Sequence, residues 1–208
     1  MMKTNLLDYM KARDLLSKYG LSSIESAYVE SAKEAINFSK GKKIVLKVLS
    51  DKALHKSKAG LVKADLSGEK EIRDAYEYLE KKARPLQPCK IIAQRMSKGG
   101  IEIIIGSNTD PEFGKTVLIG LGGIYVEAFK DVAIRIAPIT KYDATDMLQQ
   151  LRSSSVITSA GARAPMIESI LMKVSRMVND HPEISELDLN PVIITEEGYD
   201  IVDIRVLE

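Results

Sequence analysis

The sequence predicts an α/β protein of the α+β type, built from helices and strands in two mixed lobes. A β-branched run at residues 43–49 is typical of a strand. Further strand patterns follow at residues 89–94, 101–106, 116–120 and 131–137. Loops rich in glycine separate these patterns, so we expect a mixed or antiparallel sheet in the second half of the chain.

The first half of the chain predicts a small lobe around the strand at residues 43–49. Its other expected elements are a helix at 4–19, an extended piece at 26–29, a helix at 31–39 and a second extended piece at 61–66. Ser67 can cap a following helix, in which apolar residues recur at helical spacing from Ile72 to Leu79.

Two prolines mark the predicted boundary between the lobes. Pro85 and Pro88 stop the helix that begins after Ser67. We therefore expect residues 1–88 to form one lobe and residues 89–208 the other, with a ligand between them.

Composition excludes several classes of protein. The chain has 208 residues, of which 45% are hydrophobic, and a formal net charge of +1, so no nucleic-acid footprint is visible. The single cysteine, Cys89, allows no internal disulfide and fits a reducing compartment. Neither a signal peptide nor an apolar run of about 20 residues is present, so we expect a cytoplasmic protein with no membrane contact.

The C-terminal hairpin is the most informative local feature. Extended runs at 186–195 and 199–207 are joined by a turn near Glu197, which places Asn190 roughly opposite Asp203. In the second run the polar residues alternate with Val202, Ile204 and Val206. One anionic and one neutral oxygen ligand on adjacent strands suit Mg²⁺, which keeps few protein ligands. The alternative is a polar hairpin that merely faces solvent.

A second group of residues suggests phosphate binding. Lys47 lies on the predicted strand and can hold phosphates as a point charge, while Gly60 lets backbone amides approach an anion. His55 has Lys56 and Lys58 as neighbours, which favour a neutral, nucleophilic imidazole. A loop histidine can also be structural or simply solvated.

The end of the predicted strand at 89–94 suggests a base-binding segment. Gln94 and Met96 lie at the lobe junction, where the backbone can bond an adenine edge and the methionine can cover its face. Met96 can equally be a packing residue. The glycine turn at 120–123 can bind phosphate or simply join two strands.

Taken in order, these segments resemble the ATP-grasp β subunit of the ADP-forming acyl-CoA synthetases (acetate–CoA ligase, ADP-forming), which are related to succinyl-CoA synthetase. The resemblance covers nearly the whole chain. The segments that carry it are Val45 to Val48, Leu54 to Ser57, Gly99 to Gly106, Asp110 to Gly114, Gly120 to Glu127, Lys130 to Val132, Arg135 to Pro138 and Asp188 to Val192. It implies an ATP-grasp fold with the nucleotide between the two lobes.

The resemblance also implies roles for single residues. Lys47 resembles the lysine that holds the phosphates of ATP or ADP, and Asn190 and Asp203 resemble the paired Mg²⁺ ligands. His55 resembles the catalytic histidine that is transiently phosphorylated, taking the group from a partner's phosphohistidine and passing it to ADP. The other nucleotide-binding positions that it implies are Gly60, Gln94, Met96, Glu102 and Arg135.

The implied reaction is acyl-CoA + ADP + phosphate = carboxylic acid + ATP + CoA, of which this chain handles the nucleotide half. The implied partner is a CoA-binding α subunit, in an assembly with two copies of each chain. The sequence departs from the family pattern at Arg95, Lys58 and Leu61. Two alternatives are a nucleotide-binding regulatory module without phosphoryl relay and an ATP-grasp ligase that joins a carboxylate to an amine.

Overall fold

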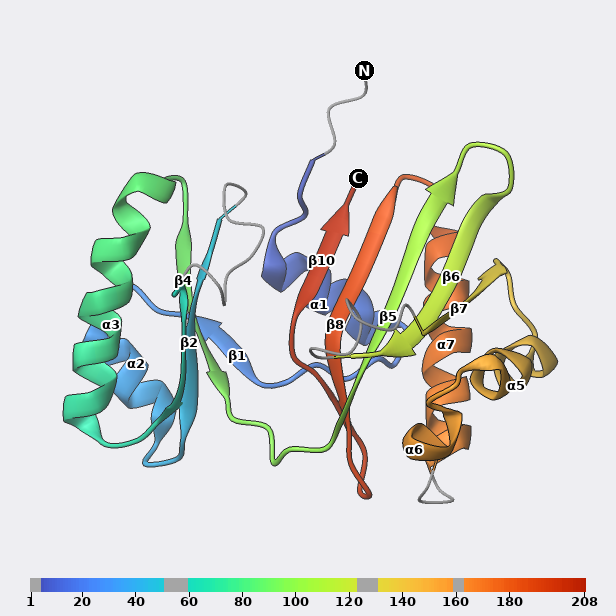
Figure 1. The fold of residues 1–208 in the computed structure, drawn as a ribbon. Helices are drawn as coiled ribbons and strands as arrows, with labels where there is room; N and C mark the ends of the chain where they lie inside the picture. Colours follow the sequence, from blue (N-terminus) through green and yellow to red (C-terminus); the bar gives the residue numbers. More distant parts are fainter. Residues whose placement is uncertain (1–4, 51–59, 123–130, 159–162) are drawn as a thin grey trace. The chain divides into compact units, whose positions relative to one another are not determined.

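The structure is a computed structural model that describes residues 5–50, 60–122, 131–158 and 163–208. The chain folds into two compact units. The smaller unit comprises Ile24–Ser97, and the larger one comprises Met1–Ser23 together with Lys98–Glu208 (Figure 1).

The smaller unit is a four-stranded sheet with helices against one face (Figure 1). The order of the strands is β1, β4, β2, β3, and all neighbours are antiparallel. The strands are β1 (Ser26–Tyr28), β2 (Ile44–Leu49), β3 (Val62–Leu66) and β4 (Lys90–Arg95). The helices are α2 (Ala32–Ser39) and α3 (Glu69–Ala83), and the 3-10 turn η1 (Arg84–Leu86) follows α3.

The apolar stripe of α3 explains how the helix packs. Ile72, Ala75, Tyr76 and Leu79 are buried together with Ile44, Leu46 and Val48 of β2. The prediction that Ser67 caps this helix is wrong, because Gly68 is the N-cap residue and makes no side-chain bond. The Ser67 N–H instead donates to the Glu71 carboxylate at 2.8 Å. Acidic residues in the first turn of α3 stabilise the positive end of the helix dipole.

The larger unit is a six-stranded sheet in the order β10, β8, β5, β6, β7, with β9 also paired to β8. The strands are β5 (Ile101–Asp110), β6 (Gly114–Leu121), β7 (Val132–Ile136), β8 (Glu186–Ile194), β9 (Tyr199–Ile201) and β10 (Ile204–Leu207). The helices are α1 (Tyr9–Lys18), α5 (Lys141–Gln150), α6 (Ser154–Thr158) and α7 (Arg163–Asp180). Every pair of neighbouring strands is antiparallel, as the glycine loops predicted.

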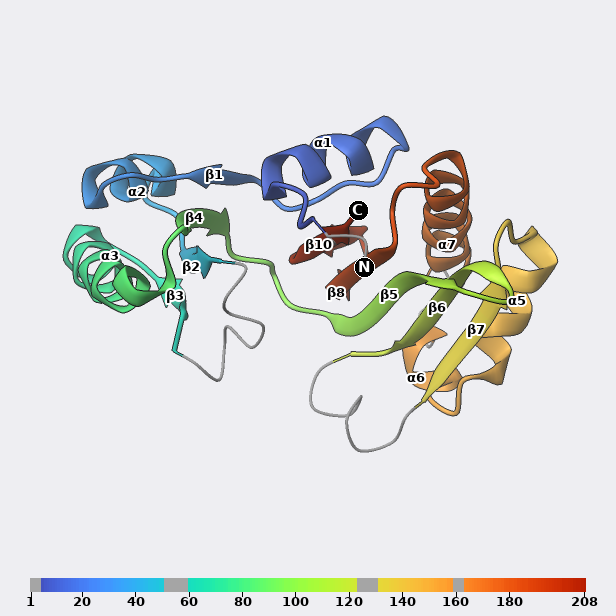
Figure 2. The same ribbon diagram turned by 90° about the horizontal axis from the view of Figure 1, so that it is seen from above.

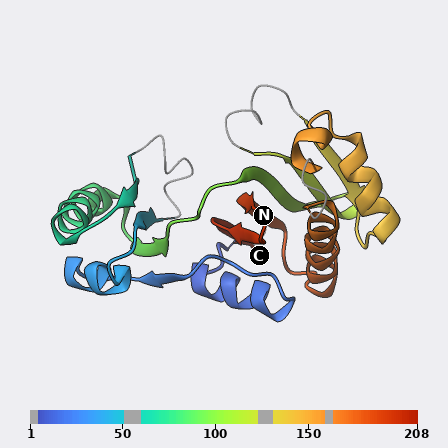
Figure 3. The same ribbon diagram turned by 90° about the horizontal axis from the view of Figure 1, so that it is seen from below.

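Alternation along the strands separates two faces of the larger sheet. One face is covered by helices, with α1 against β10, α7 against β5 and β6, and α5 against β7 (Figures 2 and 3). Its buried residues include Ile103, Ile105, Val117, Ile119, Leu187 and Leu189. We call the other face the open face; it carries the alternate residues, among them Glu102, Asn108, Ile134 and Asp188.

The compact units do not follow the predicted division into residues 1–88 and 89–208. β4 follows the two prolines but returns to the smaller sheet as an inner strand between β1 and β2. α1 belongs to the larger unit, because it packs against β10 and the Leu7 N–H donates to the Val206 carbonyl at 2.9 Å. A proline that ends a helix therefore does not mark the end of a compact unit.

The part of the chain that the structure describes contains no helix long and apolar enough to cross a membrane.

Candidate functional site

The structure places Asn190 directly opposite Asp203, as the sequence predicted. Their strands pair with Leu189 opposite Ile204 and with Val192 opposite Ile201. Between these pairs, the Asn190 N–H donates to the Asp203 carbonyl at 3.3 Å. We call Asn190 and Asp203 the metal pair, after the role that the sequence predicts for them.

A β-bulge in β8 lies at the metal pair. β5 pairs Ile103 with Val192 and Ile105 with Leu189, so that Asn190 and Pro191 together oppose one residue of β5. Proline has no N–H to give to a ladder, and a bulge is one of the few places where an inner strand tolerates it. Leu189 and Val192 both stay buried, while Asn190 between them is exposed.

The facing strand has a matching irregularity. Ile201 and Ile204 are both buried, and the two residues between them, Val202 and Asp203, are half-buried. The predicted alternation, with Val202 on the same apolar face as Ile204, is therefore wrong at this point. Two consecutive residues leave the core on both strands, and the register between the strands stays continuous, so Asp203 lies at the level of Asn190.

A short turn fixes the register of the hairpin. The Thr195 N–H donates to the Gly198 carbonyl at 2.9 Å, and the Gly198 N–H donates to the Thr195 hydroxyl at 3.0 Å. The Glu197 N–H also donates to that hydroxyl, at 3.2 Å. The hydroxyl thus satisfies the backbone of the turn locally.

The metal pair fits a magnesium ion by the chemistry of its donors. Carboxylate and amide oxygens are hard ligands, and Mg²⁺ typically keeps only one or two protein ligands alongside water and phosphate oxygens. One Asp203 carboxylate oxygen accepts the Ile204 N–H at 3.1 Å, which restricts the orientation of the group. No group of three or more His, Cys, Asp or Glu residues that could hold a metal occurs among the described residues.

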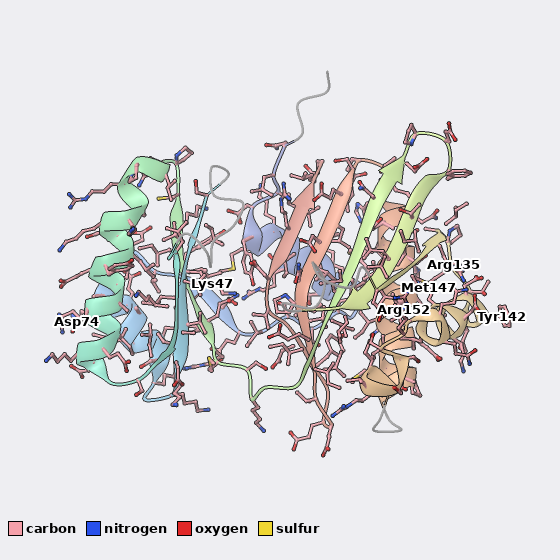
Figure 4. The ribbon with its side chains drawn as sticks, in the orientation of Figure 1. Lys47, Asp74, Arg135, Tyr142, Met147 and Arg152 are labelled. Carbon is pink, nitrogen blue, oxygen red and sulfur yellow. The ribbon has the colours of Figure 1, made fainter. Side chains whose placement is uncertain are left out.

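In the smaller unit the structure brings Lys47 and Gln94 onto one face of the sheet. Lys47 (labelled in Figure 4) lies on β2 opposite Ile92, and Gln94 lies two residues further along β4, so the two side chains are diagonal neighbours. Both are buried, with exposed fractions of 7% and 1%. The Gln94 amide donates to the Ser26 hydroxyl at 3.1 Å. The residues beside them in sequence, Leu46 and Ala93, belong to the core under α2 and α3.

The side chain of Arg95 turns toward α2. Its Nε lies 3.0 Å from a Glu25 carboxylate oxygen, and its Nη1 donates to the Ser39 carbonyl at 2.7 Å. The hydrogen bond from Arg95 holds the pKa of Glu25 below its ordinary value. Met96 follows, with 42% of its surface exposed, and its N–H donates to the Lys43 carbonyl at 3.3 Å. Sequence reasoning did not find Glu25 or Ser39 as partners of Arg95, because they are distant in sequence.

Glu102 and Arg135 lie on different faces of the larger sheet. Glu102 is exposed on the open face, and its carbonyl accepts the Gly122 N–H at 2.7 Å. Arg135 shares the helix side of β7 with Ala133 and forms an ion pair with Asp146 of α5 (Figure 4). The structure therefore does not bring Arg135 together with the metal pair.

Gly60 has a left-handed backbone, while His55 and Gly123 of the glycine turn lie outside the described residues. The φ angle of Gly60 is +69°, and a Cβ atom there would lie 3.3 Å from the Tyr78 hydroxyl. The predicted close approach of an anion to this backbone stays a prediction.

Replacing Gly60 by Ala is expected to destabilise the chain by about 1–2 kcal/mol, the usual cost of a left-handed conformation for a residue with a Cβ. Urea unfolding followed by circular dichroism measures this loss. Gly198→Ala is the matched control, because no atom lies within 4 Å of its Cβ and its φ is not left-handed. An equal loss in both variants would contradict the conformational explanation.

Asp131 lies in a segment that carries the family resemblance, but the sequence did not predict its hydrogen-bond partners. Its carboxylate accepts the N–H groups of Arg152 at 2.9 Å and Ser153 at 2.8 Å, and also the Ser153 hydroxyl. Burial alone would raise the pKa of Asp131, but the hydrogen bonds from Ser153 and Arg152 outweigh it and lower the pKa. The network ties the start of β7 to the segment before α6.

Asp131→Asn is expected to lower the unfolding free energy at pH 7 by about 1.5–3 kcal/mol, the range for a hydrogen bond to a charged group. Because the folded-state pKa is depressed, this stability is present above the unfolded pKa of about 3.9 and is lost as the pH falls through the folded value. Urea unfolding at pH 7, 5, 4 and 3 should show the wild type and the variant converging below about pH 4. If the difference in unfolding free energy between the wild type and the variant stays constant down to pH 3, the stability does not come from the ionised Asp131 carboxylate.

The fold and the metal pair together define a class of protein. The chain belongs to the ATP-grasp family, because its residues 2–207 match the ATP-grasp domain. It is 35% identical over 207 residues to subunit beta of acetate–CoA ligase (ADP-forming) I from Pyrococcus furiosus, covering 95% of this chain and 89% of that one. Other curated relatives are longer, and the chain spans about 31% of one of them.

Two solved structures of dinucleotide forming acetyl-coenzyme A synthetase 1 from Ca. Korarchaeum cryptofilum have the same fold. One, in complex with coenzyme A, Ca-AMPCP and HgCl⁺, matches with a TM-score of 0.89 and 35% identity over 99% of this chain and 93% of that chain. The other, with coenzyme A and Mg-AMPPCP, has its phosphohistidine segment pointing towards the nucleotide binding site. It matches with a TM-score of 0.82 and 34% identity over 97% of this chain and 92% of that chain.

Proposed function

We propose that this chain is the nucleotide-binding subunit of an ADP-forming acyl-CoA synthetase and catalyses phosphoryl transfer between a phosphohistidine and ADP. The observation that carries the proposal is the metal pair. Asn190 and Asp203 face each other where both strands of the hairpin leave the core, in a chain that matches the ATP-grasp domain from end to end. A solvent-facing polar hairpin would need no such paired irregularity.

The relatives support the remaining parts of the reaction. One is named as subunit beta of an acetate–CoA ligase, and a solved relative holds coenzyme A together with a magnesium nucleotide. The overall reaction would be acyl-CoA + ADP + phosphate = carboxylic acid + ATP + CoA, which makes the complex an acid-thiol ligase. The thioester chemistry would then belong to a CoA-binding α subunit, with two copies of each chain in the assembly. A cytoplasmic location is part of the proposal and accords with the single cysteine.

Each residue of the site contributes a separate part of phosphoryl transfer. Asn190 and Asp203 would hold Mg²⁺, which when bound neutralises charge on the nucleotide phosphates. Lys47 would hold the phosphates as a point charge, which is strong because the side chain is nine-tenths buried. Gln94 and Met96 would bind the base, with Gln94 already oriented by Ser26. Glu102 and Gly60 would complete the nucleotide contacts.

His55 would carry the phosphoryl group. In the direction of ATP synthesis the bond between phosphorus and the imidazole nitrogen breaks, and a bond from phosphorus to a terminal β-phosphate oxygen of ADP forms. The nitrogen keeps the electron pair of the broken bond, so no oxidant or further reactant is needed. Arg135, which is held by Asp146, would stabilise β7 rather than contact the nucleotide.

Reconstitution tests this proposal. The purified chain is mixed with a CoA-binding α subunit, acetyl-CoA, ADP, phosphate and Mg²⁺, and ATP is measured by luciferase. ATP should form only when both chains and Mg²⁺ are present. Tight binding of ATP without turnover would favour a regulatory module, and ADP release driven by a carboxylate and an amine would favour a carboxylate–amine ligase.

A further inference from the structure

We propose that Arg95 is a positioning residue for the base of the nucleotide: it anchors the end of β4 to α2, so that Gln94 and Met96 keep the orientation that binding requires. The inference rests on the proposed function. Arg95 would not touch the nucleotide, since alternation along β4 places its side chain on the opposite side from Gln94.

The guanidinium of Arg95 is held by three partners at once. It lies 3.0 Å from the Glu25 carboxylate, donates to the Ser39 carbonyl at 2.7 Å and lies 4.7 Å from the centre of the Phe38 ring. Only 16% of the side chain is exposed. A planar guanidinium can bond a carboxylate and a carbonyl in fixed directions while it stacks on a ring, which a lysine cannot do.

The C-terminus of α2 accepts a hydrogen bond from a cation that lies outside the helix. The last turn of α2 contains no basic residue, and the chain leaves the helix through Lys40 in a left-handed conformation. Carbonyl groups at a helix C-terminus carry partial negative charge and attract cations. Arg95 supplies this charge from β4, so that the strand and the helix end are joined by one side chain.

The backbone N–H groups of Arg95 and of the residue after it are both hydrogen-bonded to other segments of the chain. The Arg95 N–H donates to the Glu25 carbonyl at 3.0 Å, and the Met96 N–H donates to the Lys43 carbonyl at 3.3 Å. Because the Met96 N–H is already bonded, recognition of a base by this segment depends on side chains and carbonyl groups. Their directions depend in turn on how firmly Arg95 holds the end of β4.

The position of Lys47, the proposed phosphate-binding residue, does not depend on the contacts of Arg95. Lys47 lies opposite Ile92, three residues before Arg95, in a part of β2 that pairs with both β3 and β4. Loss of the Arg95 contacts should therefore weaken binding of the base and leave binding of the phosphates unchanged.

The test compares a complete nucleotide with its phosphate chain alone. Equilibrium binding of MgADP and competition by magnesium tripolyphosphate are measured on the complete chain by isothermal titration calorimetry. For Arg95→Met we expect the dissociation constant of MgADP to rise about tenfold, while that of magnesium tripolyphosphate changes by less than about twofold. Arg95→Lys keeps the positive charge but loses the planar set of donors of the guanidinium. It should give a rise in the dissociation constant of MgADP that lies between those of the wild type and Arg95→Met.

Two further variants complete the test, one at a contact of Arg95 and one at an unrelated arginine. Glu25→Ala removes the carboxylate partner of Arg95 and, if Arg95→Met fails to fold, should still raise the dissociation constant of MgADP selectively. Arg176→Met is the matched control, an arginine of α7 whose Nε lies 3.6 Å from Asp180, and it should change neither constant. Unchanged MgADP affinity in folded Arg95→Met, or an equal loss for both ligands, would overturn the inference. A wild-type chain that binds neither ligand would instead overturn the proposed function.

Discussion

Replacing His55 by Asn is expected to abolish labelling of the chain by ATP that carries a radioactive γ-phosphate. In the proposed relay the covalent intermediate on this chain is phosphorylated His55, and asparagine cannot form it. The loss should be on the order of 10³-fold or more, because the covalent route disappears rather than slows. Wild-type label should be labile in acid and stable in base, and it is measured by rapid filtration after quenching in alkali.

The second histidine supplies a matched control for this experiment. His181 follows α7, where its Nδ1 lies 2.8 Å from a Glu183 carboxylate oxygen. His181→Asn should leave labelling unchanged. If the wild type, with the α subunit supplied, labels no more than His55→Asn, the relay must be abandoned, although the fold and the metal pair would stand.

Replacing Asp203 by Asn should reduce phosphoryl transfer by about 10²–10³-fold, the usual effect of losing one charge-stabilising contact in the transition state. The variant keeps an oxygen opposite Asn190 but loses the anionic charge that attracts Mg²⁺. The rate should therefore recover in part as the Mg²⁺ concentration is raised. Initial rates between 0.1 and about 50 mM Mg²⁺ measure this shift in metal dependence.

A surface aspartate separates this effect from a general loss of acidic charge. Asp74 is exposed on α3 (Figure 4), and Asp74→Asn should leave both the rate and the magnesium dependence unaltered. An Asp203→Asn chain with wild-type magnesium dependence would remove Asp203 from the metal pair. The wild-type hydrogen bond from Asn190 to the Asp203 backbone does not involve the carboxylate, so the fold should survive the change.

Much of the fold could be predicted because local patterns and tertiary contacts agree. The apolar stripe of α3 and the β-branched run of β2 became buried elements as expected. The helix α5 was missed, although Thr140 and Asp143 form a capping box that marks its start. Its sequence carries a weaker apolar pattern, because only Ala144, Met147 and Leu148 are buried.

The candidate site was predictable where it depends on counting residues along a hairpin. Asn190 and Asp203 were found because a turn near Glu197 sets their register. The contacts of Arg95 were not predictable, since Glu25 and Ser39 reach it only through the tertiary fold. The side of β7 on which Arg135 lies was missed for a different reason: the motif identified the residue, but not which face of the sheet it occupies.

The turn that Thr195 stabilises sets the register of the two strands, and the register decides which residue lies opposite Asn190. Counting outward from the turn in both directions brings Asn190 and Asp203 to the same level, so their partnership is encoded as an equal number of residues on each side. One residue gained or lost between Thr195 and Gly198 would give Asn190 a different partner while leaving the composition almost unchanged. If Asn190 and Asp203 bind Mg²⁺ as proposed, the length of this surface turn is as much a part of the metal chemistry as the two ligands themselves.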